Sequence, residues 1–145
     1  MRDLRNDGAD IGNGQRALFT FVGFTLLGPF FAGLSVLGAF ILAPLFKLEA
    51  LLPVDAPSAG EAAVFAFIWA AIPAGIAGAA LAVIVWRRAT FDWLAAAAAG
   101  GIGFMLAAIV VPLPQTLALT PLTVLAIAIS MLVRLALNSG GMIQR

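Results

Sequence analysis

The sequence contains no histidine, cysteine or tyrosine, and only 10% of its 145 residues are charged. Without histidine or cysteine the chain has no imidazole base, no thiolate nucleophile and none of the usual ligands for haem, iron–sulfur clusters or zinc. We therefore expect no catalytic residue, no cofactor and no metal site. The protein is predicted not to be an enzyme.

The composition also excludes a water-soluble globule and a nucleic-acid-binding protein. Apolar residues make up 63% of the chain, well above the roughly 45 to 50% of soluble domains. The longest basic run is the pair Arg87-Arg88, whereas a nucleic-acid binder presents a broad basic face.

Three uncharged apolar stretches cover most of the chain, at residues 17–46, 62–86 and 93–133. Each is longer than the roughly 20 residues that cross a bilayer as a helix. As one helix the third stretch would be about 60 Å long, about twice the hydrocarbon thickness, so it must fold back on itself. The fold is therefore predicted to be an all-α integral membrane protein, a bundle of four transmembrane helices at about 17–46, 62–86, 93–111 and 117–137.

Prolines mark the break inside the third stretch. Pro112 and Pro114 stop one helix, and Thr120 followed by Pro121 is typical of an N-cap and the first residue of the next. The fourth helix is therefore expected to begin at about 117 or at 121.

The first stretch is too long for a cleaved signal peptide, whose apolar part has roughly 7 to 15 residues, so we interpret it as a retained anchor with a kink at Pro29. Ser58 to Glu61 is expected to form a turn leading into the second helix. Residues 87–92 form a short link, so the second and third helices should be antiparallel neighbours.

The basic residues predict the orientation of the chain. Seven of the eight fall on one side of a four-span arrangement, and only Lys47 falls on the other. Because basic loops resist translocation, both termini are predicted to be cytoplasmic, with tails 1–16 and 138–145. The bacterial inner membrane is the expected location.

Three arginines near the predicted helix ends are candidate contact residues. Arg134 could bind a substrate anion or a partner carboxylate if it were at the bilayer centre, but Asn138 and Ser139 follow closely, so we expect it to reach the headgroups. Arg87 and Arg88 are interpreted as topology determinants, with contact to anionic lipid or an acidic partner as the functional alternative.

Small residues recur at four-residue spacing in the second and third helices, a pattern typical of close helix packing in lipid. The stripes are Ala71, Gly75 and Ala79; Ala74, Gly78 and Ala82; and Ala99, Gly103 and Ala107. They predict contact between the second and third helices, with contact to another protein as the alternative. The two stripes on the second helix leave room for both.

Two further features suggest a ligand. Phe24, Leu27 and Phe31 fall on one face of the first helix, which either packs against lipid or holds a carotenoid, a quinone tail or an acyl chain. Pro73, in the middle of the second helix, either bends it or helps to create a cavity.

The remaining possibilities are non-enzymatic. No ionisable side chain lies within 17–46 or 62–86, which argues against proton-coupled transport. We expect a structural, assembly or regulatory subunit that packs through its helix faces with a larger membrane complex or with itself. The alternative is a transport component or carrier for an apolar or lipid-like molecule. The expected partners are membrane lipids and either other membrane-protein subunits or a second copy of the chain.

Overall fold

The computed structural model describes residues 12–46, 58–111 and 119–142, and within these ranges the chain is helical without strands. It contains α1 (Asn13–Leu42), α2 (Ala59–Arg88), α3 (Trp93–Val110) and α4 (Leu119–Ser139). All four helices are long and apolar enough to span a membrane.

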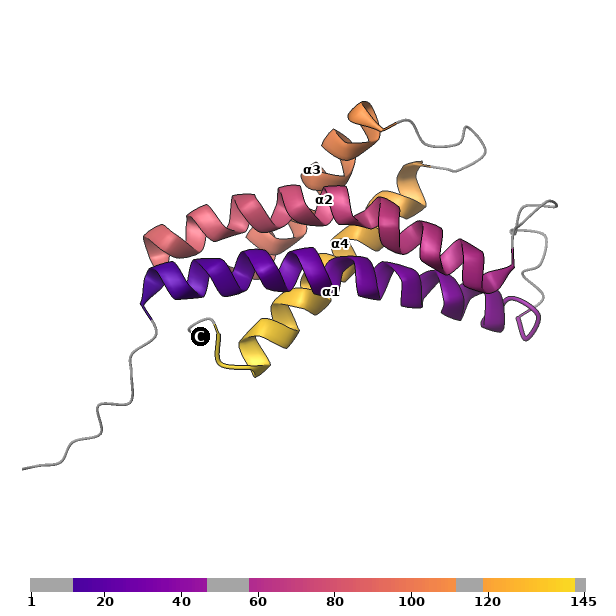
Figure 1. Cartoon of the computed structure of the whole chain (residues 1–145), viewed down its shortest axis with the longest axis horizontal. Helices are drawn as coiled ribbons and strands as arrows, with labels where there is room; N and C mark the ends of the chain where they lie inside the picture. Colours follow the sequence, from indigo (N-terminus) through magenta and orange to yellow (C-terminus); the bar gives the residue numbers. More distant parts are fainter. Residues whose placement is uncertain (1–11, 47–57, 112–118, 143–145) are drawn as a thin grey trace, which may run out of the picture.

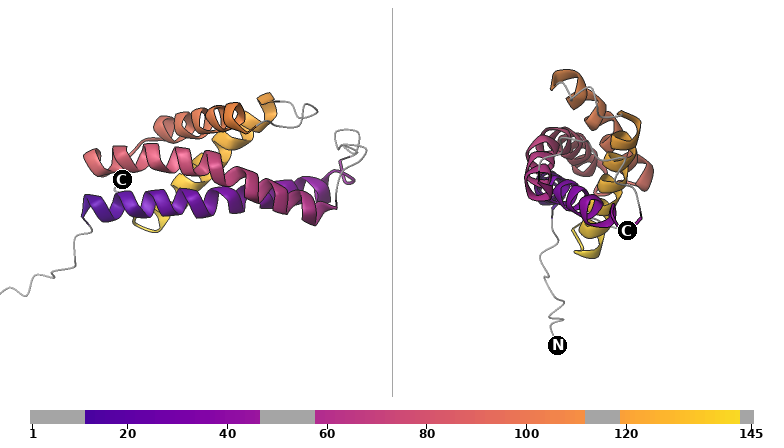
Figure 2. Two further views of the ribbon diagram at one scale, coloured as in Figure 1. Left: turned by 45° about the horizontal axis from the view of Figure 1, so that its top comes forward. Right: turned by 90° about the vertical axis from the view of Figure 1, so that its right-hand side faces the viewer.

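The helices form two antiparallel pairs. The long α1 and α2 lie side by side along their whole length and make the most extensive contact in the molecule (Figure 1). The second pair, α3 and α4, packs across the first, with α4 running obliquely over α1. The start of α1, the end of α2 and the end of α4 lie at the same end of the molecule (Figure 2).

Local hydrogen bonds define where two helices begin. The Ser58 hydroxyl accepts from the Glu61 backbone N–H, while the Glu61 carboxylate accepts from the backbone N–H of Ser58, which is the reciprocal capping box. Asp92 caps α3 by accepting from the backbone N–H of Ala95 at 2.7 Å. Ala89 ends α2 in the left-handed conformation, with φ of 60°.

The observed helix bounds differ from the predicted ones where hydropathy is a poor guide. α1 begins at Asn13, four residues before the predicted span, because polar residues continue the helix. α4 begins at Leu119, so Thr120 lies inside the first turn and is not the N-cap. Pro121 fits there because backbone N–H groups of the first turn have no helical acceptor. The predicted break at Pro112 and Pro114 lies outside the described residues.

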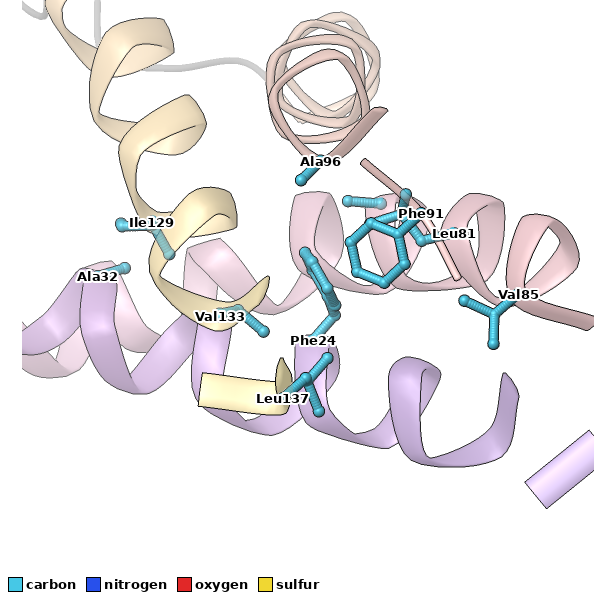
Figure 3. Close-up of a cluster of buried hydrophobic side chains, with 10 residues drawn as sticks. Phe24, Ala32, Leu81, Val85, Phe91, Ala96, Ile129, Val133 and Leu137 are labelled. Carbon is cyan, nitrogen blue, oxygen red and sulfur yellow. The ribbon is translucent and has the colours of Figure 1, made fainter. Parts of the chain in front are cut away.

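The hydrophobic core lies where the two pairs cross (Figure 3). Phe24 is 2% exposed and meets Phe91 edge to face, with ring centroids 6.1 Å apart. Val133 and Leu137 of α4 pack beside this aromatic pair. Phe24 therefore joins α1 to the α2–α3 turn and to α4, and it does not face lipid.

Candidate functional site

One of the predicted small-residue stripes packs α2 against α1. A Cβ atom built on Gly78 would lie 2.9 Å from Cβ of Phe24, and one built on Gly28 would lie 2.8 Å from Cβ of Ala74. Carbon atoms do not normally approach so closely, so glycine is required at both contacts. The stripe containing Ala74 and Gly78 thus contacts the first helix, whereas the sequence suggested the third.

The stripe on α3 does meet α2. A Cβ atom on Gly103 would lie 2.9 Å from the Pro73 carbonyl oxygen and 3.4 Å from Cβ of Ala77. Ala99 packs against the core and Ala107 is fully buried. Gly100, which was not singled out from the sequence, faces α4, where its Cβ would lie 2.6 Å from Cβ of Ser130.

The other stripe on α2 is uncovered. Ala71 and Ala79 are exposed, and nothing lies within 4 Å of a Cβ atom built on Gly75. Exposed side chains of Ile68 and Ile72 flank this face. The stripe with Ala74 and Gly78 therefore packs against another helix of the same chain. The stripe with Gly75 contacts no other helix among the described residues.

Arg134 lies against the turn between α2 and α3. Its Nε donates to the Phe91 carbonyl oxygen at 3.0 Å. Its guanidinium carbon lies 4.3 Å from the centroid of the Trp93 ring and 5.7 Å from that of Phe91, both within cation–π range. Arg134 thus fastens the end of α4 to this turn.

The four arginines of the described ranges share one end of the molecule. Arg16 is buried near the start of α1, where the Asn13 side chain donates to the Trp86 carbonyl oxygen. Arg87 and Arg88 are exposed in the last turn of α2. Of these four arginines, Arg87 and Arg88 are therefore the exposed pair, whereas Arg16 and Arg134 are held against other parts of the chain.

A large apolar cavity opens between the two helix pairs, away from the arginine end. Its volume is about 840 Å³, within the range of ligand-binding pockets. Its wall is formed by α1 and its following turn from Phe24 to Phe46, by α2 from Ala62 to Ala77, by Gly100 and Phe104 of α3, and by α4 from Pro121 to Val133. None of the described side chains that line it is charged.

Three of the lining side chains carry a polar atom, and none of these atoms is a free group facing the cavity. Ser130 donates its hydroxyl to the Ala96 carbonyl oxygen at 2.6 Å, and Ser35 donates to the Phe31 carbonyl oxygen at 2.7 Å. Trp69 packs on Phe104, with ring centroids 5.4 Å apart. Its Nε1 is buried and has no hydrogen-bond partner, unlike every other buried side-chain nitrogen or oxygen of the described residues.

The cavity combines one predicted feature with others that the sequence did not indicate. Pro73 lines the cavity, in agreement with the alternative prediction that this proline helps to create one. Phe24 is also part of the lining, at the end nearest the hydrophobic core. Trp69, Phe104 and Ser130 were not predicted as site residues. The only sequence signal for Trp69 is its position in the interior of an apolar stretch. Trp86 and Trp93 lie at helix ends, where tryptophans of membrane proteins usually occur.

The wall of this cavity is apolar, so it can exclude water and contact hydrocarbon. Among the described residues, no cluster of acidic side chains could hold a metal ion. Comparison with protein-family models, curated proteins and solved structures found no match.

Proposed function

We propose that this chain is a non-enzymatic integral protein of the bacterial inner membrane that binds an apolar or lipid-like molecule between its two helix pairs. It would act as a transport component or carrier for that molecule, with both termini in the cytoplasm. The observation that carries this proposal is the apolar cavity of about 840 Å³, to which all four helices contribute.

The shape of the cavity supports a hydrocarbon ligand. From the core at Phe24 and Val133 it extends to Phe46 and Ala62, near the end opposite the arginines. If the arginines are cytoplasmic, the cavity lies toward the outer leaflet. A hydrocarbon chain would then enter from that leaflet without crossing the charged end.

Cavity filling tests the proposal. Ala66 lines the cavity, and Ala80 is exposed on the same helix. We expect protein purified in mild detergent to retain an apolar molecule, which native mass spectrometry would detect and solvent extraction would identify. Ala66→Phe should lower its occupancy severalfold, while Ala80→Phe should leave it unchanged. Equal occupancy in both variants would place the molecule outside the cavity.

A second function is favoured by the open stripe on α2. Membrane helices associate through small residues that let backbones approach closely, and Ala71, Gly75 and Ala79 form such a face with nothing against Gly75. This supports a structural, assembly or regulatory subunit that packs with another membrane protein or with a second copy of the chain.

The two functions are separated by what is purified with the chain. Stoichiometric protein subunits that are lost on Gly75→Leu would support the subunit function. Retention of an apolar molecule by a protein without partner chains would support the carrier function alone.

A further inference from the structure

Arg87 and Arg88 are exposed at the end of α2, and the described part of the chain provides neither of them with a partner. The described ranges contain two acidic residues. Glu61 belongs to the capping box at the opposite end of α2, and Asp92 caps α3 through the Ala95 backbone N–H. Within these ranges, no hydrogen bond, ion pair or ring contact involves the guanidinium group of Arg87 or of Arg88.

The other two arginines of the described ranges serve the interior of the molecule. Arg16 is 9% exposed. Arg134 donates to the Phe91 carbonyl oxygen and lies over the Trp93 ring. The structure thus distinguishes two arginines that hold the fold together from an adjacent pair that faces outward.

Two exposed tryptophans indicate the depth of this pair in a membrane. Trp86 is 68% exposed and directly precedes the pair, at the end of the uncharged stretch 62–86, and Trp93 is 45% exposed across the turn. Tryptophans of membrane proteins concentrate at the boundary between hydrocarbon and headgroups, and each residue advances a helix by about 1.5 Å. In the proposed membrane arrangement, both arginines therefore lie just beyond this boundary, at the level of the lipid phosphates.

The chemistry of the pair fits a phosphate group that carries net negative charge. A guanidinium group is planar, stays protonated and donates two parallel hydrogen bonds to phosphate oxygens. A zwitterionic lipid brings its own cation, which two neighbouring arginines repel, whereas an anionic lipid does not. A phospholipid also places hydrocarbon beside the exposed ring of Trp86, so one molecule satisfies both the charged and the apolar side chains.

We infer that Arg87 and Arg88 bind the headgroup phosphate of an anionic phospholipid in the cytoplasmic leaflet. This inference rests on the membrane placement given under the proposed function. It is independent of the molecule that the cavity binds, because the cavity lies away from the arginine end and neither arginine lines it.

Lipid binding to the purified full chain tests the inference. The protein is delipidated in a maltoside detergent, and the affinities for dioleoyl phosphatidylglycerol and dioleoyl phosphatidylcholine are measured by native mass spectrometry. These lipids have the same acyl chains and differ in net charge. The variant is Arg87→Gln/Arg88→Gln, and the matched control is Arg2→Gln/Arg5→Gln, which removes the same amount of charge from another part of the sequence. In a micelle, binding does not depend on the orientation that the arginines give the chain in cells.

We expect the wild type to bind phosphatidylglycerol more tightly than phosphatidylcholine. Arg87→Gln/Arg88→Gln should weaken phosphatidylglycerol binding by about fivefold per arginine, or about 25-fold for the pair, and the control should keep the preference. Phosphatidylcholine should bind all three proteins alike. The preference should also decrease as the ammonium acetate concentration rises, because salt screens the attraction between exposed charges.

Several results would overturn the inference. Equal losses in the two double variants would mean that net charge alone attracts the lipid, and an unchanged preference in Arg87→Gln/Arg88→Gln would place the lipid elsewhere. Displacement of phosphatidylglycerol by an equal concentration of inorganic phosphate would identify a soluble anion as the ligand. Absence of any lipid preference, together with a co-purifying protein that Arg87→Gln/Arg88→Gln loses, would identify an acidic protein partner. In every case the occupancy of the cavity should be the same in the three proteins, so the proposed carrier function is tested separately.

Discussion

Arg134 and Phe91 are 43 positions apart in the chain, and the Nε of the arginine donates to the carbonyl oxygen of the phenylalanine at 3.0 Å. Phe91 in turn places its ring against Phe24 of α1. One short segment between α2 and α3 thus receives contacts from both the first and the last helix. The stability of the arginine end should depend on this segment.

Removing the Arg134 side chain should therefore destabilise the bundle. Arg134→Ala loses a charge-assisted hydrogen bond and the cation–π contact with Trp93. Because the side chain is only half-buried, we expect a loss of about 2 kcal/mol, measured by unfolding in mixed detergent micelles. Arg88→Ala, which removes an exposed arginine, should change the stability by less than about 0.5 kcal/mol. Equal effects would show that Arg134 contributes only charge.

Two glycines on α2 should differ in their sensitivity to the same substitution. Gly78→Leu places a side chain where Phe24 and the Phe21 backbone already lie, so it should separate α1 from α2 and cost at least about 1 to 3 kcal/mol. Gly75→Leu extends into open space and should leave the thermal unfolding temperature in detergent nearly unchanged. A large loss from Gly75→Leu would mean that this face is covered in the native assembly.

The left-handed residue Ala89 offers a stabilising substitution. Its φ of 60° is unfavourable for a residue with a Cβ atom, so Ala89→Gly should stabilise the protein by about 1 kcal/mol. Ala80→Gly, in the interior of α2, should instead destabilise it by about 0.5 to 1 kcal/mol. Thermal unfolding of both variants in the same detergent would measure the difference. If Ala89→Gly were neutral or harmful, the turn would not be held in this conformation.

The orientation can be tested with single cysteines, because the chain has none of its own. Gly60 and Ser139 are exposed at opposite ends of the molecule. In intact bacterial spheroplasts, an impermeant thiol reagent should label Gly60→Cys and leave Ser139→Cys unlabelled until the cells are broken. The reverse pattern would invert the proposed topology.

Local sequence patterns predicted those features that depend on neighbouring residues. Ser58 to Glu61 was predicted as a turn before a helix at 62, and the structure instead has Ser58 as the N-cap, with Ala59 to Glu61 in the first turn of α2. The three apolar stretches and the length of the third indicated four helices, and the described residues form four that are apolar and long enough to span a membrane. Thr120 was misinterpreted because a proline in the first turn fits several positions of that turn equally well.

Features that depend on how the helices pack were not predictable. Small-residue spacing marked Gly78 as a contact, but whether it would face α1 or α3 depends on the rotation of α2 about its own axis. The cavity arises where the two helix pairs diverge, and the partner of Arg134 comes from a distant turn. Neither the angle between the pairs nor the contact across 43 positions leaves a periodic signal in the sequence.

The helices differ in length by a margin that concerns the surrounding bilayer. At about 1.5 Å per residue, the 30 residues of α1 and of α2 give rods of about 45 Å, whereas the 18 residues of α3 give about 27 Å. In the proposed membrane arrangement, the bilayer beside the long pair would have to thicken or the pair would have to tilt, while the bilayer beside α3 would be matched or slightly compressed. Such unequal helix lengths would favour sorting of the protein toward regions where membrane thickness changes.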